Sequence, residues 1–372
     1  MRGMTGVQAT AAAALLLAGT ALGGASSARA DVPVVVATIK PLHALAAGVM
    51  AGVGTPDLLV QGAASPHDYA LKPSDARLLD RAGVVIWAGP GVESFMPRII
   101  DGLAGKARTL AMIDAPGVKP VPIREGGVWE PHEHAHGDHD DHDHEEHGHE
   151  EHGHADDGHD HDDHAHDDHG HDDHGHDDHG HDDHGHDDHG HGDHDHDHGA
   201  MDGHVWLSPA NARAMVAEIA HVLAEADPEH AARYRDNAAA YDARLAKLDQ
   251  TVTAKLAPVK TRPFIVFHDA YQYFETAYGL AGVGSVTLNP EQPPGARRIT
   301  ELRQRITDGG VACVFAEPQF DPRLVKTLTE GTSAKSAVLD PVGADLTPGP
   351  DAYPELITAL ARSMTDCLAP GA

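Results

Sequence analysis

Short apolar runs rich in β-branched residues recur along the chain, and stretches of helical character separate them. The runs lie at 32–38, 57–62, 84–89 and 109–114 in the first third, and at 263–268, 311–317 and 336–340 in the last third. Such runs are typical of strands that are covered on both faces. Strands that alternate with helices indicate parallel sheets, so we expect an α/β fold with two lobes.

The region between the two sets of strands has the pattern of long helices. Ser208 and Pro209 form a good helix start, and that helix should run to about Glu225. Apolar residues then recur at spacings of three and four from Tyr234 to Leu256. This stripe predicts a helix of about 28 residues, long enough to join the two lobes as a rigid spine.

The first 30 residues have the pattern of a secretory signal peptide. Arg2 precedes a short apolar run rich in alanine, and Ala28-Arg29-Ala30 matches an A-x-A cleavage site. A membrane anchor is the alternative, but the run is short for a span of about 20 residues. We therefore expect a mature protein that begins at Asp31 and lies in the periplasm.

Composition changes sharply between residues 130 and 202. Of the 33 histidines, 27 lie between His132 and His198, and 29 of the 58 acidic residues lie between Glu130 and Asp202, a stretch with no Lys or Arg. Most of the net charge of −31 therefore belongs to this insert. Imidazole is the commonest side-chain metal ligand, so the insert indicates binding of divalent metal ions.

The composition of the insert also bears on its structure and on other possible functions. It lacks the apolar residues of a core and is expected to be disordered without metal, although a solvated acidic spacer is an alternative reading. The zinc-hydrolase spacing H-x-H-x-D-H occurs at His159–His164 but recurs with the repeat, so it carries little information. A chain this acidic is not expected to bind nucleic acid.

Four residues outside the insert are candidate ligands. His67, His268 and Asp340 each follow an apolar run, and ligands of parallel sheets bind beyond the carboxyl ends of strands. His204 lies just before the connecting helices. Three nitrogen donors and one oxygen donor suit tetrahedral Zn²⁺. Cys313 and Cys367 indicate a disulfide in an oxidising compartment, with a two-cysteine metal site as the alternative.

Six motifs carry a resemblance to a known family. In order they are SPHDYALKPSD, GHVWLSP, PFIVFHDAYQYFE, NPEQPPGARRI, CVFAEPQF and VLDPVG. Together they resemble the periplasmic zinc-binding proteins of ABC importers, the ZnuA-like branch of the cluster A-I metal receptors. The resemblance implies two α/β lobes joined by a long helix, with metal in the cleft between them.

The resemblance also implies roles for particular residues. It carries the metal ligands onto His67, His204 and His268, and it implies a Cys313–Cys367 disulfide. Related manganese receptors usually place Glu where His268 stands, so His268 favours zinc. Some zinc members have Glu before the first ligand, where this chain has Pro66, so the fourth ligand is expected to be Asp340, with water as the alternative.

We therefore divide the chain into a signal peptide (1–30), an N-terminal lobe (31–122), the insert (123–203), connecting helices (204–260) and a C-terminal lobe (261–372). The expected function is high-affinity capture of Zn²⁺ and delivery to an ABC permease with a separate ATPase subunit. The insert would collect zinc at low affinity. The chain has no Walker-A pattern and is expected to be a monomer and not an enzyme.

Three alternatives to this function remain at this point. The chain could be a periplasmic zinc buffer or chaperone, or a receptor for another divalent metal such as Mn or Ni. A zinc hydrolase would need an open coordination position and a general base. Glu317 is the one nearby carboxylate that could serve as that base, and a structural or ligand-supporting role suits it better.

Overall fold

The computed structural model describes residues 32–102, 105–124, 201–287, 290 and 292–370. The chain divides into two units, one of Met1–Glu130 with His198–Ala372 and one of Pro131–Asp197. The signal peptide prediction and nearly all of the insert lie outside the described residues. The lobe boundaries that the sequence predicts remain predictions.

The first sheet contains four parallel strands in the order β2-β1-β3-β4. These strands are β1 (Val35–Ala37), β2 (Asp57–Leu58), β3 (Val84–Trp87) and β4 (Arg108–Ala111). The helical elements of this part are α1 (Lys40–Val49), α2 (Pro73–Asp80), α3 (Met96–Gly102) and the short 3-10 turn η1 (Met112–Asp114).

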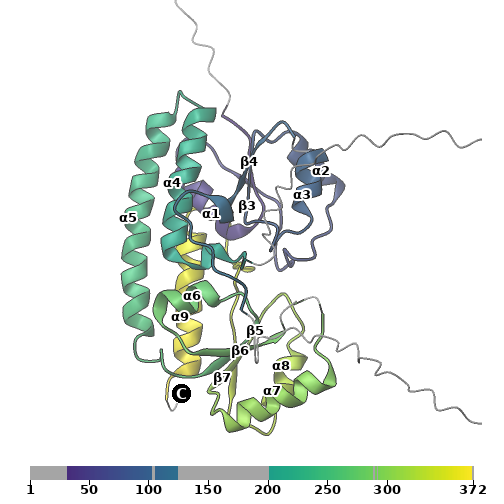
Figure 1. Ribbon diagram of the computed structural model, residues 1–372. Helices are drawn as coiled ribbons and strands as arrows, with labels where there is room; N and C mark the ends of the chain where they lie inside the picture. The colour runs from purple at the N-terminus through teal and green to yellow at the C-terminus, as the bar shows by residue number, and fades with distance from the viewer. Residues whose placement is uncertain (1–31, 103–104, 125–200, 288–289, 291, 371–372) are drawn as a thin grey trace, which may run out of the picture. The chain divides into compact units, whose positions relative to one another are not determined.

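The second sheet repeats this architecture with parallel strands in the order β6-β5-β7-β8. Its strands are β5 (Phe264–His268), β6 (Gly282–Thr287), β7 (Cys313–Ala316) and β8 (Lys335–Val338). Helices α6 (Gln272–Tyr278), α7 (Ala296–Asp308) and α8 (Arg323–Thr329) connect them. The two parallel sheets confirm the predicted α/β fold, and Figure 1 shows them one above the other.

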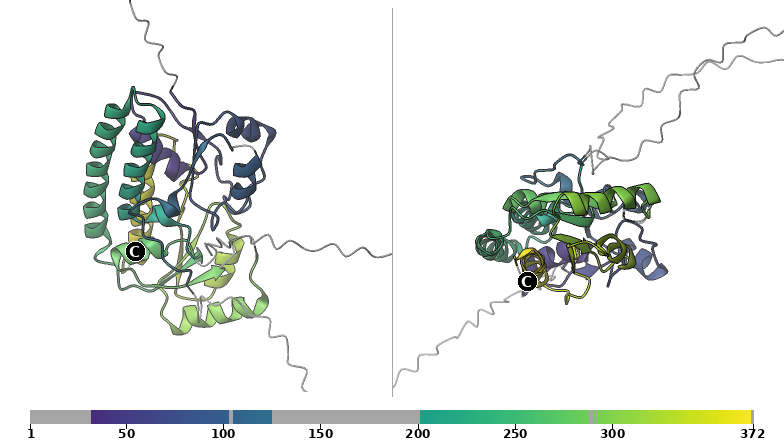
Figure 2. Two further views of the ribbon diagram at one scale, coloured as in Figure 1. Left: turned by 45° about the horizontal axis from the view of Figure 1, so that its top comes forward. Right: turned by 90° about the horizontal axis from the view of Figure 1, so that it is seen from below.

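The connecting helices are close to the predicted ones. After the 3-10 turn η4 (Val205–Leu207), α4 runs over Pro209–Ala226 and α5 over Ala231–Leu256, and α9 (Ala352–Leu368) is the last helix among the described residues. Ser208 caps α4, because its hydroxyl accepts a hydrogen bond from the backbone N–H of Asn211. Figures 1 and 2 show α4, α5 and α9 side by side on one side of both sheets.

Both faces of β1, β3, β5 and β7 are buried, as their continuous apolar runs predict. Val35 and Ala37 of β1 belong to a large core shared with α1, α4, α5 and α9, whereas Val36 between them faces a separate core under α2 and α3. The large core also includes Phe264 and Phe315 of the second sheet. The two sheets therefore share one continuous apolar core through these helices.

Polar contacts add to the connection between the two sheets. The Lys40 ammonium group, at the start of α1, donates to the carbonyl oxygens of Gly343 and Ala344 at 2.5 and 2.6 Å. The Trp206 indole N–H donates to the carbonyl oxygen of Pro341 at 2.8 Å. The loop that follows β8 is thus held by residues from earlier parts of the chain.

Cys313 of β7 and Cys367 of α9 form a disulfide, which confirms that prediction. Among the described residues, no helix is both long enough and apolar enough to span a bilayer.

Close packing in the helical layer depends on Gly48, because a Cβ atom there would lie 2.9 Å from the Tyr241 ring of α5.

Candidate metal centre

His268 lies at the carboxyl end of β5, and its imidazole is held by a carboxylate on the neighbouring strand. The parallel pairing of β5 with β7 sets Phe264 beside Cys313, and the same offset brings Glu317 beside His268. His268 Nδ1 lies 2.8 and 2.7 Å from the two Glu317 oxygens. Both side chains are almost fully buried. A carboxylate only accepts, so Nδ1 carries the proton and the Nε2 lone pair is free for a metal.

His204 is held in the same way by a carboxylate two residues before it. Asp202 Oδ1 accepts hydrogen bonds from the backbone N–H of His204 at 2.9 Å and from its Nδ1 at 2.7 Å. The backbone of Asp202 is fixed in turn, since its N–H donates to Val121 and its carbonyl accepts from the Tyr273 hydroxyl. His204 Nε2 is therefore also the nitrogen that is free to bind a metal.

His67 comes from the loop between β2 and α2. Its backbone N–H donates to the Ser65 hydroxyl at 3.3 Å. The end of this loop is fixed by Asp75, which accepts hydrogen bonds from Tyr69 and from the backbone of Lys72. His67 is less buried than the other two imidazoles.

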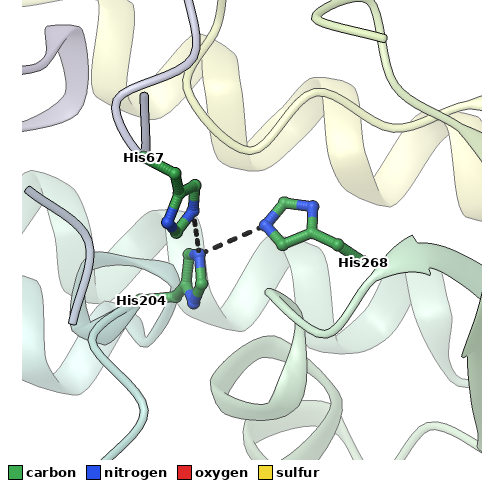
Figure 3. A group of neighbouring side chains, drawn as sticks. All are labelled: His67, His204 and His268. Carbon is green, nitrogen blue, oxygen red and sulfur yellow. Dashed lines mark hydrogen bonds between the residues drawn. The ribbon is translucent and has the colours of Figure 1, made fainter. Parts of the chain in front are cut away.

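The three imidazoles converge on one point (Figure 3). His204 Nε2 lies 3.3 Å from His67 Nε2 and 3.3 Å from His268 Nε2. In a tetrahedral zinc site with Zn–N bonds of about 2.0–2.1 Å, neighbouring nitrogens are about 3.3 Å apart. These two distances therefore suit Zn²⁺, and the ligand atoms of all three histidines lie within 4.8 Å of one another.

The protonation pattern also favours a cation. With Nδ1–H bonded to carboxylates, the neutral forms of His204 and His268 direct two Nε2 lone pairs at each other across 3.3 Å. A proton or a metal ion between them removes that repulsion. Burial lowers the pKa of His268, but the charge and hydrogen bond of Glu317, with the charges of Asp269 and Asp202, outweigh it, so the pKa is raised. The pKa of His67 is lowered well below its usual value, first by burial and then by the two other imidazoles.

Asp340, the fourth predicted ligand, is not a member of the three-histidine group. Its Oδ1 accepts hydrogen bonds from Gln319 and from the backbone N–H groups of Val342 and Gly343, and its Oδ2 accepts from Ala344. These bonds hold the carboxylate on the loop after β8. Its role as a ligand stays a prediction.

Two cavities adjoin the imidazoles. The smaller has a volume of about 10 Å³. It is lined by all three histidines together with Trp206, Glu317 and Gln319, among others. The larger has a volume of about 540 Å³ and is also lined by the carboxylates Asp68, Asp202 and Asp269. Carboxylates around such a cavity favour the presence of cations.

Asp202 and Gln319 were not among the predicted site residues. The D-x-H spacing of Asp202 and His204 was the available signal, since it lets a carboxylate reach the imidazole of the second residue. Glu317 was identified as ligand-supporting, and its hydrogen bonds to His268 agree with that interpretation. The remaining histidines among the described residues lie elsewhere: His43 is buried against Pro56, His221 is exposed and His230 bonds to Asp227.

Comparisons with known proteins agree with one another. A family model for ZnuA, component A of the zinc-uptake complex and periplasmic, matches residues 35–367. The high-affinity zinc uptake system protein ZnuA of Brucella abortus is 50% identical over 334 residues, 90% of this chain and 91% of that protein. The protein of the same name from Yersinia pestis is 34% identical over 361 residues, 97% of each chain.

Solved structures show the same fold. A crystal structure of ZnuA has a TM-score of 0.64 to this chain at 20% identity, covering 91% of this chain and 100% of that one. A zinc-bound ZnuA lacking its residues 138–173 has a TM-score of 0.65 at 20% identity, covering 92% and 100%. These likenesses establish that the two-sheet α/β architecture is shared.

Proposed function

The chain belongs to the ZnuA family of periplasmic zinc-uptake components, and on this premise we propose that His67, His204 and His268 bind the Zn²⁺ that is taken up. The protein acts in the periplasm as a high-affinity zinc-binding component of an uptake system. The observation that carries the ligand assignment is the distance of 3.3 Å from His204 Nε2 to the Nε2 atoms of both His67 and His268, which is the edge length of a zinc tetrahedron.

The donor set supports zinc as the cargo over harder metal ions. Three neutral imidazoles suit Zn²⁺, whereas Mn²⁺ and Mg²⁺ prefer carboxylate, carbonyl and water oxygens. The carboxylates of Asp202 and Glu317 bond to the imidazoles and not to the metal position, which makes the imidazoles better donors. The fourth ligand is an oxygen, from Asp340 or from water.

The insert is proposed to collect zinc at low affinity and to raise its concentration near the site. Support comes from the described residues at its two ends. Pro122 and Met201 pair as a bridge, so the chain leaves and returns at one place. Arg124 forms ion pairs with Asp269, next to His268, and with Glu275 of α6. On the other side, Asp202 bonds to His204.

The zinc-uptake complex is proposed to contain a membrane permease and a separate ATPase subunit, to which this chain delivers zinc as a monomer. A role as an enzyme is not part of the proposal. Glu317, the carboxylate best placed to act as a general base, accepts hydrogen bonds from His268 with both of its oxygens. It supports a ligand and is not positioned to activate a water molecule.

A zinc titration by calorimetry at neutral pH tests the assignment. The protein without residues 132–198 should bind one tight equivalent, and His268→Ala should abolish it. The matched control is His221→Ala, which removes a histidine that is 65% exposed on α4 and should leave tight binding unchanged. If the protein without the insert binds no tight zinc, or if His268→Ala binds as before, the assignment is wrong.

A further inference from the structure

Gln319 occupies an unusual position beside the three imidazoles. It follows β7 by three residues and lines the small cavity that all three histidines also line. Its amide nitrogen donates to Asp340 Oδ1 at 2.9 Å. Its amide oxygen is buried and has no hydrogen-bond partner among the described residues.

The orientation of this amide follows from its neighbour. A carboxylate oxygen accepts but cannot donate, so the NH₂ group of Gln319 must face Asp340 and the carbonyl oxygen must face away. Asp340 cannot turn to release the amide easily, because three backbone N–H groups of residues 342–344 also bond to it. The carbonyl oxygen of Gln319 is thus fixed as an acceptor without a donor.

The cavity is about large enough for one further small ligand atom. Its volume is about 10 Å³, and a cavity of about this volume can hold one water molecule. The other polar groups at its wall already have partners, since Glu317 bonds to His268 and Ser65 bonds to the backbone of His67. Three imidazoles leave one position of a tetrahedral zinc ion open.

We propose that Gln319 is a positioning residue of the metal site, whose amide oxygen accepts a hydrogen bond from the water molecule that completes the coordination of Zn²⁺. This inference rests on the proposed function. In it, Asp340 acts by fixing the amide and water supplies the fourth ligand. Water bound to zinc is a stronger donor than bulk water, and it suits an acceptor that has no other partner.

The neutral amide also fits a site that carries zinc as cargo. A carboxylate at this position could take the proton of the bound water and produce hydroxide, as the general base of a zinc hydrolase does. An amide oxygen accepts the hydrogen bond but does not take the proton. The water therefore stays a neutral ligand that can be exchanged when zinc is passed on.

The test uses the full chain, with zinc affinity measured by competition with a chelator that first removes weakly held zinc. Gln319→Leu should lower the affinity of the tight site about tenfold, as loss of a residue that supports a ligand does. Gln319→Glu has no N–H group to donate to Asp340 and should lose affinity as well. A purely structural role would instead lower the denaturant midpoint of the zinc-free Gln319→Leu protein, which should stay close to that of the wild type. Gln272→Leu is the matched control, since Gln272 also has a buried carbonyl oxygen but lines only the larger cavity.

A second comparison separates this role from direct ligation by Asp340. In an Asp340→Asn background the side-chain oxygen can still hold the Gln319 amide, so Gln319→Leu should again cost about tenfold. The inference would be overturned if Gln319→Leu did not lower zinc affinity in the Asp340→Asn background. It would also be overturned if Gln272→Leu lowered zinc affinity and Gln319→Leu did not. The proposed function fails separately, if tight binding survives His268→Ala.

Discussion

Replacement of Glu317 by Gln tests how the protein prepares His268 for zinc. The carboxylate lies 2.7 Å from Nδ1 in a pair that is nearly inaccessible to solvent, so its charge is little screened. The amide can still accept one hydrogen bond from Nδ1 but has no charge. Loss of such a supporting group typically costs about 10- to 100-fold in metal affinity, or about 1.4–2.7 kcal/mol. We expect a loss in the lower part of this range for Glu317→Gln.

The assay is a chelator competition at mildly alkaline pH, where proton competition for His268 is weaker than at neutral pH. This choice matters because Glu317 raises the pKa of His268, and its removal also reduces proton competition. Glu355→Gln is the control, since it removes the same charge from an exposed position on α9. Equal affinity in both variants and the wild type would refute the idea that Glu317 prepares the imidazole.

Three further predictions concern pH, the disulfide and a helix cap. Zinc affinity should fall about tenfold per pH unit below neutrality, because His268 has a raised pKa and must lose its proton before it binds zinc. The lowered pKa of His67 keeps that imidazole neutral over the same range. Zinc titrations at several pH values measure this dependence, and an affinity that does not change with pH would contradict it. Cys313→Ser, which opens a loop closed across 54 residues to Cys367, should cost about 4 kcal/mol of unfolding free energy in the chain-entropy model. Denaturant titration against the oxidised wild type measures this cost, and the reduced wild type should match the variant. Ser208→Ala should cost about 1 kcal/mol in the same assay, because it removes the cap of α4, and an unchanged midpoint would contradict that role.

The sequence predicted the fold well where local pattern and burial agree. The apolar runs of β1, β3, β5 and β7 are covered on both faces, and the stripe in α5 is the buried face of that helix. The strand β6 (Gly282–Thr287) was missed, because its sequence GVGSVT contains two glycines, which weaken a strand pattern. Its pairing with β5 depends on contacts distant in sequence.

The grouping of His67, His204 and His268 was also within reach of sequence reasoning, but the contacts that support these proposed ligands were not. His268 was identified because it ends a strand, a position that parallel sheets place at the ligand-binding edge. The pairing of Asp202 with His204 and the hydrogen bond of Gln319 to Asp340 depend on side-chain directions. Spacing along the chain does not determine those directions.

The central claim is that the tight zinc ion lies between the three imidazoles. The most direct measurement is a crystal structure of the full chain with one equivalent of zinc, using anomalous scattering at the zinc absorption edge to locate the ion. The account predicts that the strongest anomalous peak lies about 2.0–2.1 Å from Nε2 of His67, His204 and His268. A strongest peak held by histidines of residues 132–198, or one without His268, would contradict it.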